Sequence, residues 1–124
     1  MLIIKNKAFH KWAIKEDLAD AALLAAVNEM ERGLIDVELG GHVVKKRIAV
    51  DGRGKSGGLR TIIAYKAGSK VFFVYGFAKN TRANISATEL KALKYLAKEL
   101  LGYSDTELNV AIKSGVLIEV ENDG

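Results

Sequence analysis

The spacing of hydrophobic residues along the chain switches between a helical period and a strand period. Leu23, Val27 and Met30 recur at intervals of four and three, which is the pattern of a helix with one buried face, and Gly33 then ends the segment. Other short runs are rich in Val, Ile and Phe, as strands are. The predicted helices cover Lys7–Glu16, Leu18–Glu31, Ser86–Leu101 and Ser104–Ser114. The predicted strands cover Leu2–Lys5, His42–Val50, Leu59–Lys66, Val71–Ala78 and Val116–Val120.

Two helix starts carry a capping-box pattern, in which a serine is followed three residues later by a glutamate. Ser86 precedes Glu89 and Ser104 precedes Glu107, and Gly102 ends the first of these two helices. In such a box each side chain bonds the backbone N–H of the other residue. The pattern therefore fixes where both helices begin.

The strand that follows the Gly40-Gly41 turn carries charged residues among apolar ones. Most of its apolar residues share one face, and Lys45 and Arg47 point to the other face. Lys46 interrupts the apolar face, so we expect it near an end or an edge of the sheet.

Aromatic residues gather in the strand predicted before the third helix. Strict alternation places Phe73, Tyr75 and Phe77 on one face and Phe72 on the other. Core packing is the expected role of most of them, and Tyr75 is the one that could stack on a base.

These elements follow the order βααβββα, with one helix and one short strand added after Gly102. We expect an α+β fold in which an antiparallel sheet has its helices, including the N-terminal helical hairpin, packed on one face. The sequence shows no repeat or change of composition that would divide it, so residues 1–124 are expected to form one domain.

Charge is unevenly distributed in this chain of 124 residues. The segment from His42 to Asn84 holds ten of the nineteen basic residues and a single acid, Asp51, which gives a net charge of +9. The remainder holds nine cations and fourteen acids, a net charge of −5. Such a split predicts one surface that binds a polyanion, most economically nucleic acid.

Residue usage removes several kinds of chemistry. The chain has no cysteine, which excludes disulfides, thiolate zinc sites and a cysteine nucleophile, and it has only two histidines. No metal or other cofactor is expected, because Asp51 stands alone in the basic segment and metal-dependent nucleases need several carboxylates. The first residues are too few and too soon charged for a signal peptide, so the protein is expected to be cytoplasmic.

Cations stand on or beside three consecutive strands of the predicted sheet. Neighbouring strands can bring these side chains together, so they are the candidates for a catalytic site. The candidate catalytic residues are Lys45, Lys46, Arg47, Arg60, Lys79 and Arg82. The candidate RNA-binding residues are Arg53, Lys55, Lys66 and Lys70.

The glycine-rich loop that contains Arg53 and Lys55 has a superficial likeness to a phosphate-binding loop. The true motif needs a glycine five positions before Gly54, where this chain has Ala49, and it needs a helix afterwards, where a strand is predicted. We therefore interpret the segment as a basic loop that contacts backbone phosphates.

Three segments taken together resemble the RelE-like toxins of type II toxin–antitoxin systems, and within them the HigB-type subgroup. They are Val43–Ala49 (VVKKRIA), Lys55–Thr61 (KSGGLRT) and Tyr75–Asn80 (YGFAKN). The resemblance covers nearly the whole chain. It implies a compact toxin that cleaves messenger RNA in the decoding site of the ribosome, and a small antitoxin as partner.

The resemblance also implies roles for individual residues. Lys45, Lys46 and Arg47 match basic residues of the second sheet strand, Arg60 matches an arginine that opens the third, and Lys79 and Arg82 match basic residues after the fourth. Better-known members often carry a tyrosine or histidine near the C-terminus. This chain has no counterpart; the nearest position is Ser86, a helix cap.

Cleavage of RNA without metal needs a base for the ribose 2′-hydroxyl, cations for the charge that builds on phosphorus, and an acid for the leaving 5′-oxygen. A lysine surrounded by other cations gives up its proton more readily, so Lys45 or Lys46 is the candidate base. Arg60 is the candidate phosphate clamp, because a guanidinium keeps its charge and binds two oxygens at once. Lys79 and Arg82 would add positive charge.

Two other functions fit the same sequence. One is the ParE-like branch of this fold, whose members inhibit DNA gyrase by binding it and cut no RNA. The other is a non-catalytic nucleic-acid-binding relic of the fold, which the lack of a C-terminal aromatic favours.

Overall fold

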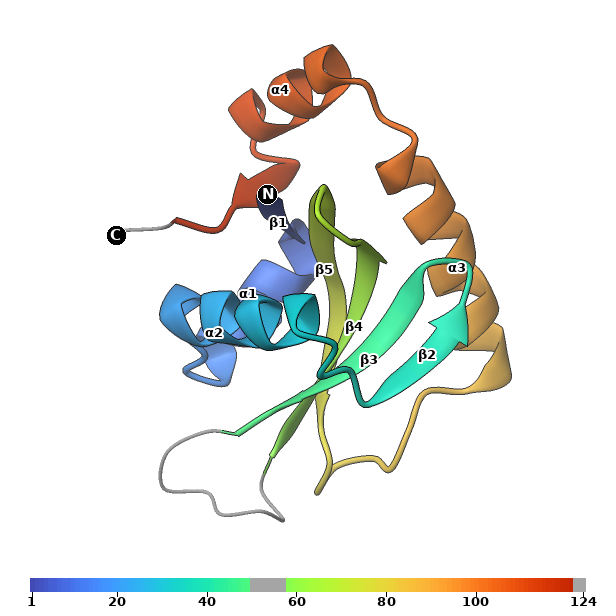
Figure 1. Cartoon of the computed structure of the whole chain (residues 1–124). Coiled ribbons are helices and arrows are strands. Elements are labelled where there is room, and N and C mark those ends of the chain that lie inside the picture. Colours follow the sequence, from blue (N-terminus) through green and yellow to red (C-terminus); the bar gives the residue numbers. More distant parts are fainter. Residues whose placement is uncertain (50–57, 122–124) are drawn as a thin grey trace.

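The computed structural model describes residues 1–49 and 58–121, and these form a sheet with helices around it (Figure 1). The basic loop with Arg53 and Lys55 lies outside the described residues. The elements in chain order are β1 (Leu2–Asn6), α1 (Lys7–Lys15), α2 (Asp20–Glu31), β2 (Val37–Gly40), β3 (Val43–Ile48), β4 (Leu59–Lys66), β5 (Lys70–Ala78), α3 (Ala87–Leu101), α4 (Asp105–Lys113) and β6 (Leu117–Glu119). Both capping boxes are present, at Ser86 and Ser104.

The strands of the described residues form one sheet in the order β2-β3-β4-β5-β1-β6. The expected α+β class is confirmed. One pair departs from the expected antiparallel arrangement, because β1 runs parallel to β5. After β1 the chain crosses one face of the sheet through α1 and α2, and it re-enters at the far edge with β2 before it winds back to β5 (Figure 1). This crossover leaves β1 parallel to the strand beside it.

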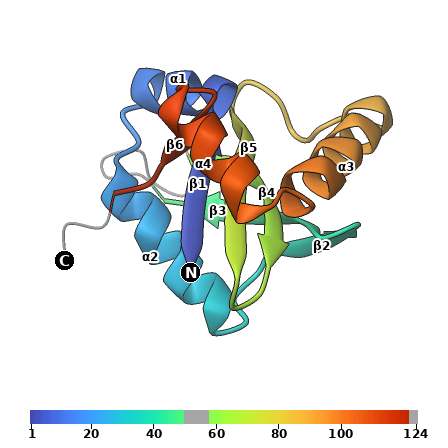
Figure 2. The same cartoon turned by 90° about the horizontal axis from the view of Figure 1, so that it is seen from above.

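Helices cover both faces of the sheet, and the expectation of helices on one face was wrong. Residues of α1 and α2 pack with Ile63 and Phe73 in one core, whereas residues of α3 and α4 pack with Ile62 and Phe72 in another. Viewed from above, α2 and α3 lie on opposite sides of the sheet (Figure 2). The sequence of β4 and β5 explains this arrangement, because adjacent residues of these strands are both apolar and point to opposite faces. Each face of the sheet therefore needs helices to bury it.

Lys46 does not lie at an edge of the sheet. The short strand β2, which the sequence did not reveal, pairs with β3 on its outer side. Lys46 is only 5% exposed, on the face toward α2, where its Nζ lies 2.7 Å from Oε1 of Glu29. The ammonium holds the pKa of Glu29 below its ordinary value. A carboxylate on the covering helix, rather than an edge position, is what accommodates this charge.

An extra residue in β5 reverses the expected direction of its aromatic side chains. Ile62 pairs with Tyr75 and Ile63 pairs with Phe73, which leaves Val74 without a partner on β4. Beyond this bulge the alternation is shifted by one residue. Phe73 therefore packs in the α1–α2 core, while Tyr75 and Phe77 face α3. The expectation that all three share one face was wrong.

Gly76 lies in this same stretch of β5, directly beneath the indole of Trp12 on α1. A Cβ at position 76 would come within 2.2 Å of the ring. The close approach sets how tightly α1 packs on the sheet.

Within the described residues no helix is long and apolar enough to cross a membrane.

We expect Gly76→Ala to lower the free energy of unfolding by about 2 kcal/mol, because the added methyl group overpacks the site. Urea denaturation measures this loss. In a Trp12→Ala background the indole is gone, so the same substitution should cost much less there. An unchanged cost in both backgrounds would show that the indole does not limit position 76.

Candidate functional site

Four cations gather on the α3 side of the sheet, at the end where β3 finishes and β4 begins. We call Lys45, Arg47, Arg60 and Arg82 the basic face. Register places Arg47 opposite Arg60, and Arg60 opposite Phe77 of β5. Opposed side chains on antiparallel strands have Cβ atoms about 5 Å apart. Two residues further along β4, the neighbouring strands place Lys45 of β3 on one side and Tyr75 of β5 on the other. The basic face is therefore one continuous surface.

Arg60 holds the centre of this surface and is half-buried. Its Nη1 is buried and has no hydrogen-bond partner within the described residues. Leaving a buried donor unpaired costs about 1–3 kcal/mol, more for a charged group. A partly buried guanidinium with an unpaired donor is stabilised when an anion binds to it. This is the property expected of a phosphate clamp.

The guanidinium of Arg47, on the strand next to Arg60, is also without an ion-pair partner among the described residues. The backbone N–H of Arg47 donates to Oδ2 of Asp36. Like charges directly opposite each other on neighbouring strands are destabilising. The pair concentrates positive charge, and within the described residues no acid forms an ion pair with either guanidinium.

Arg82 differs from the other cations of the basic face because it is already engaged. Its guanidinium binds both carboxylate oxygens of Glu89, donates from Nη1 to Tyr75 Oη at 3.0 Å, and lies 5.7 Å from the centre of the Phe77 ring. The Arg82 guanidinium, helped by the backbone N–H of Ser86, lowers the pKa of Glu89 to about 2. Glu89 in turn raises the pKa of Arg82. Arg82 is thus fixed in place, with its charge largely offset.

Lys45 reaches across from β3 to the segment that precedes α3. Its Nζ donates to Oδ1 of Asn84 at 3.4 Å. The same Asn84 accepts a bond from Nε of Arg82 through its backbone carbonyl, at 3.0 Å. Asn84 therefore links the two cations that flank the Arg47–Arg60 pair.

Tyr75 presents a phenol to the basic face as a result of the bulge at Val74. Its oxygen accepts the bond from Arg82, and the O–H of Tyr75 has no acceptor among the described residues. Its hydroxyl proton is therefore free to be donated. The sequence singled out Tyr75 only for stacking, and the contacts of Glu89 and Asn84 with this site were not foreseen, because Glu89 was explained by its capping box alone.

The remaining predicted residues do not all join this surface. Lys46 points to the opposite face, toward α2. Lys79 is exposed directly after β5, and its backbone N–H donates to the carbonyl of Gly58, so it lies at the same end of the sheet as Arg60. Lys66 and Lys70 pair across the hairpin turn, about 20 Å along β4 from Arg60. Lys70 donates there to the carbonyl of Tyr103 at 3.2 Å.

Within the described residues, no three His, Asp or Glu side chains come close enough together to hold a metal ion. Two acids contact residues of the basic face: Asp36 accepts from the backbone N–H of Arg47, and Glu89 is bound to Arg82. The site as described thus offers two guanidinium groups without an ion-pair partner, the Nζ of Lys45 and one phenol, a set suited to binding and polarising a phosphate group.

One family model matches the sequence over residues 1–120, and its description is the RelE toxin of the RelE / RelB toxin-antitoxin system. No curated protein matches the chain. The HigB-type subgroup stays a prediction. The match covers nearly the whole chain and agrees with the α+β architecture, and the chain therefore belongs to the family of RelE toxins of toxin–antitoxin systems.

Proposed function

We propose that this RelE-family toxin is a metal-independent endoribonuclease that cleaves messenger RNA, most effectively on the ribosome, and so blocks translation. The observation that carries the proposal is the opposed pair Arg47 and Arg60, two guanidinium groups on one sheet face without an acid partner among the described residues. Toxins of this family pair with an antitoxin, which would keep the activity in check.

In this proposal Arg60 binds the scissile phosphate and Arg47 supports it from the neighbouring strand. Two guanidinium groups side by side can each donate to a non-bridging oxygen. During 2′-hydroxyl attack the phosphorus becomes five-coordinate and these oxygens gain negative charge. Donors that are already in place for that charge stabilise the transition state more than the bound substrate.

Lys45 is the base that we propose for the 2′-hydroxyl, and Lys46 is set aside. Both were candidates from the sequence, but Lys46 lies on the other side of the sheet with Glu29 as its partner. Lys45 shares its face with Arg47 and Arg60. As the O2′–P bond forms, Nζ of Lys45 takes the 2′-proton.

Tyr75 is the acid that we propose for the leaving group. Because Arg82 donates to its oxygen, the phenol is oriented with its own proton available. That proton passes to O5′ as the P–O5′ bond breaks, which leaves a 2′,3′-cyclic phosphate and a 5′-hydroxyl. Arg82 keeps its hydrogen bond to this oxygen, and Lys79 at the end of β5 adds positive charge nearby.

We expect Arg60→Ala to abolish growth inhibition and to lower mRNA cleavage by about 100-fold or more, because it removes the central donor to the phosphate. Primer extension on translated messages measures the cleavage, and thermal denaturation checks the fold. Lys66→Ala is the matched control, since it removes one cation from the far end of the same strand and should leave toxicity intact. Full toxicity of Arg60→Ala, or a change in DNA supercoiling in place of cleaved messages, would refute the proposal.

We expect Tyr75→Phe to slow cleavage by about 100-fold, because it removes one proton donor and little else. The rate is measured on ribosomes carrying a short message. A message with a sulfur in place of the scissile 5′-oxygen provides the control, since a thiolate leaves without protonation and should be cut at the wild-type rate. An equal loss on both messages would mean that Tyr75 has another role.

A further inference from the structure

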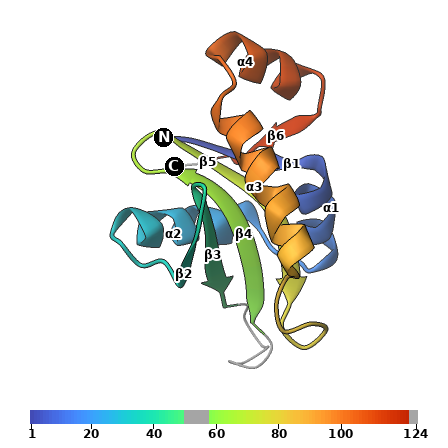
Figure 3. The same cartoon turned by 90° about the vertical axis from the view of Figure 1, so that its right-hand side faces the viewer.

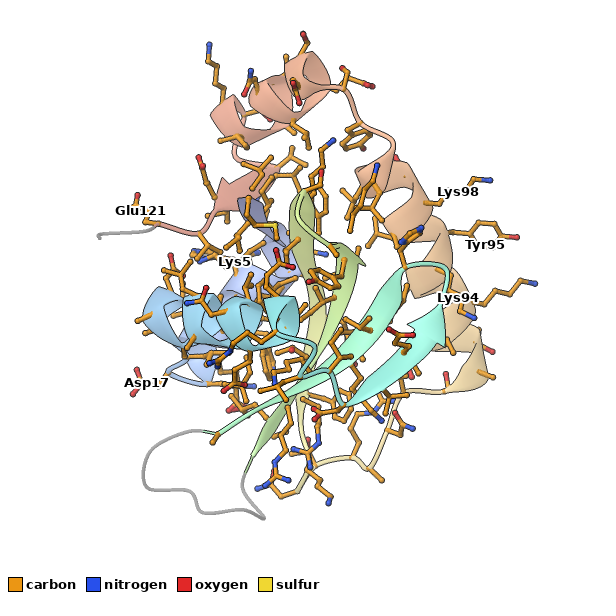
Figure 4. The ribbon with its side chains drawn as sticks, in the orientation of Figure 1. Lys5, Asp17, Lys94, Tyr95, Lys98 and Glu121 are labelled. Carbon is orange, nitrogen blue, oxygen red and sulfur yellow. The ribbon has the colours of Figure 1, made fainter. Side chains whose placement is uncertain are left out.

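A groove lies beside α3 on the side of this helix that faces away from the basic face. It has a volume of about 630 Å³ and lies between α3 and the turn that joins β2 to β3. Its walls are largely apolar, and they include four side chains of α3 that we call the α3 patch: Lys91, Lys94, Tyr95 and Lys98. Figure 3 shows α3 running along the outside of the sheet, and Figure 4 shows the labelled members of the patch pointing away from it.

Helical spacing and the neighbouring turn together keep the side chains of the α3 patch on one side of α3. The three lysines fall at positions i, i+3 and i+7, which places them along one stripe about 10 Å long. The turn residues Gly40, Gly41 and His42 all have positive φ, at 87°, 60° and 63°. This conformation lets the turn pass close to Lys94: a Cβ on Gly41 would lie 3.5 Å from Cγ of Lys94.

The α3 patch is positively charged and its aromatic ring is open to solvent. Among the described residues, no Asp or Glu lines the groove and none of the three lysines has an ion-pair partner. Tyr95 is 68% exposed, although it is one of the larger side chains of the protein. An exposed ring surrounded by unpaired ammonium groups has no role in packing this chain.

The chemistry of the patch favours nucleic acid over an acidic protein segment. Lysine is depleted at protein–protein interfaces, where its hydration is costly to remove. Lysines bind phosphates well as point charges, and an exposed aromatic ring stacks on a base of any kind. Lys91 comes two residues after Glu89, which is bound to Arg82, so the patch begins about 3 Å along the axis of α3 from Glu89 but on the other side of the helix.

We propose that the α3 patch is a second RNA-binding surface, which takes the phosphates of a single-stranded segment on its lysines and stacks a base on Tyr95. The inference rests on the proposed function in that RNA is the ligand of both surfaces. The patch lies outside the basic face and contributes no group to cleavage. Its role is to hold RNA that continues beyond the scissile phosphate, or RNA of the ribosome.

The test measures binding of the full chain to a fluorescent single-stranded RNA of twenty nucleotides, with 2′-O-methyl groups that prevent cleavage. Anisotropy titrations at several salt concentrations give the affinity and its salt dependence. The double variant Lys94→Ala/Lys98→Ala should reduce the slope of log affinity against log salt by about 1.4, since each phosphate contact contributes about 0.7. Tyr95→Ala should weaken binding about tenfold with the slope unchanged. Lys113→Ala, an exposed lysine on α4, is the control.

The outcomes separate this proposal from the proposed function. If the α3 variants bind like Lys113→Ala, or if the wild type does not bind this RNA, the second surface is refuted. It is refuted as well if these variants lose affinity for an antitoxin but keep affinity for the RNA. If the α3 variants lose RNA affinity while the wild type cuts no message, the α3 patch stands and only the ribonuclease proposal fails.

Discussion

Two guanidinium groups of like charge face each other across neighbouring strands, and the rest of the fold must hold them there. The repulsion between Arg47 and Arg60 opposes pairing of β3 with β4 at this end of the sheet. What offsets it is the burial of the same strands on both faces. Ile62, Ile63 and Phe73 are fully buried a few residues away, and apolar burial of this kind stabilises by about 2 kcal/mol per side chain.

The cations of the basic face fall into two groups with different tasks. Arg82 is bound by Glu89 and Tyr75 and rests over Phe77, so it organises the site and adds little net charge. Arg47 and Arg60 have no such partners among the described residues and keep their full charge for a ligand. This division explains how a surface can bind a phosphate strongly while the phenol beside it stays oriented. The strain of unpaired charge is confined to two residues on a rigid sheet.

Much of the fold followed from local pattern, because helical period and capping boxes depend only on residues near in sequence. The boxes at Ser86 and Ser104 fixed two helix starts correctly. Features that depend on a partner strand or helix did not follow. The bulge at Val74 exists only in relation to its pairing with β4. The position of Lys46 depends on Glu29 of α2, and the four-residue strand β2 is defined by its bonds to β3.

The candidate site was foreseen in composition more than in geometry. Summing charge over a segment identified the region of Lys45, Arg47 and Arg60, which register then brought together. The summed charge did not reveal the α3 patch, because its lysines share a segment with Glu89, Glu99 and the acids of α4. Charge that is arranged on one helical stripe is visible only when residues three and four apart are compared. Tyr75 stayed hidden because its direction depends on the bulge.

We expect Arg47 and Arg60 to form one anion site at the centre of the basic face. The most direct test follows the side-chain Nε–H resonances of the arginines by NMR during titration with a 2′-deoxy trinucleotide, which binds without being cut. We expect the resonances of Arg60 and Arg47 to shift together, with one shared dissociation constant. A shared anion site is contradicted if these two resonances do not move while the backbone amides near Lys66 and Lys70, at the other end of the sheet, shift instead.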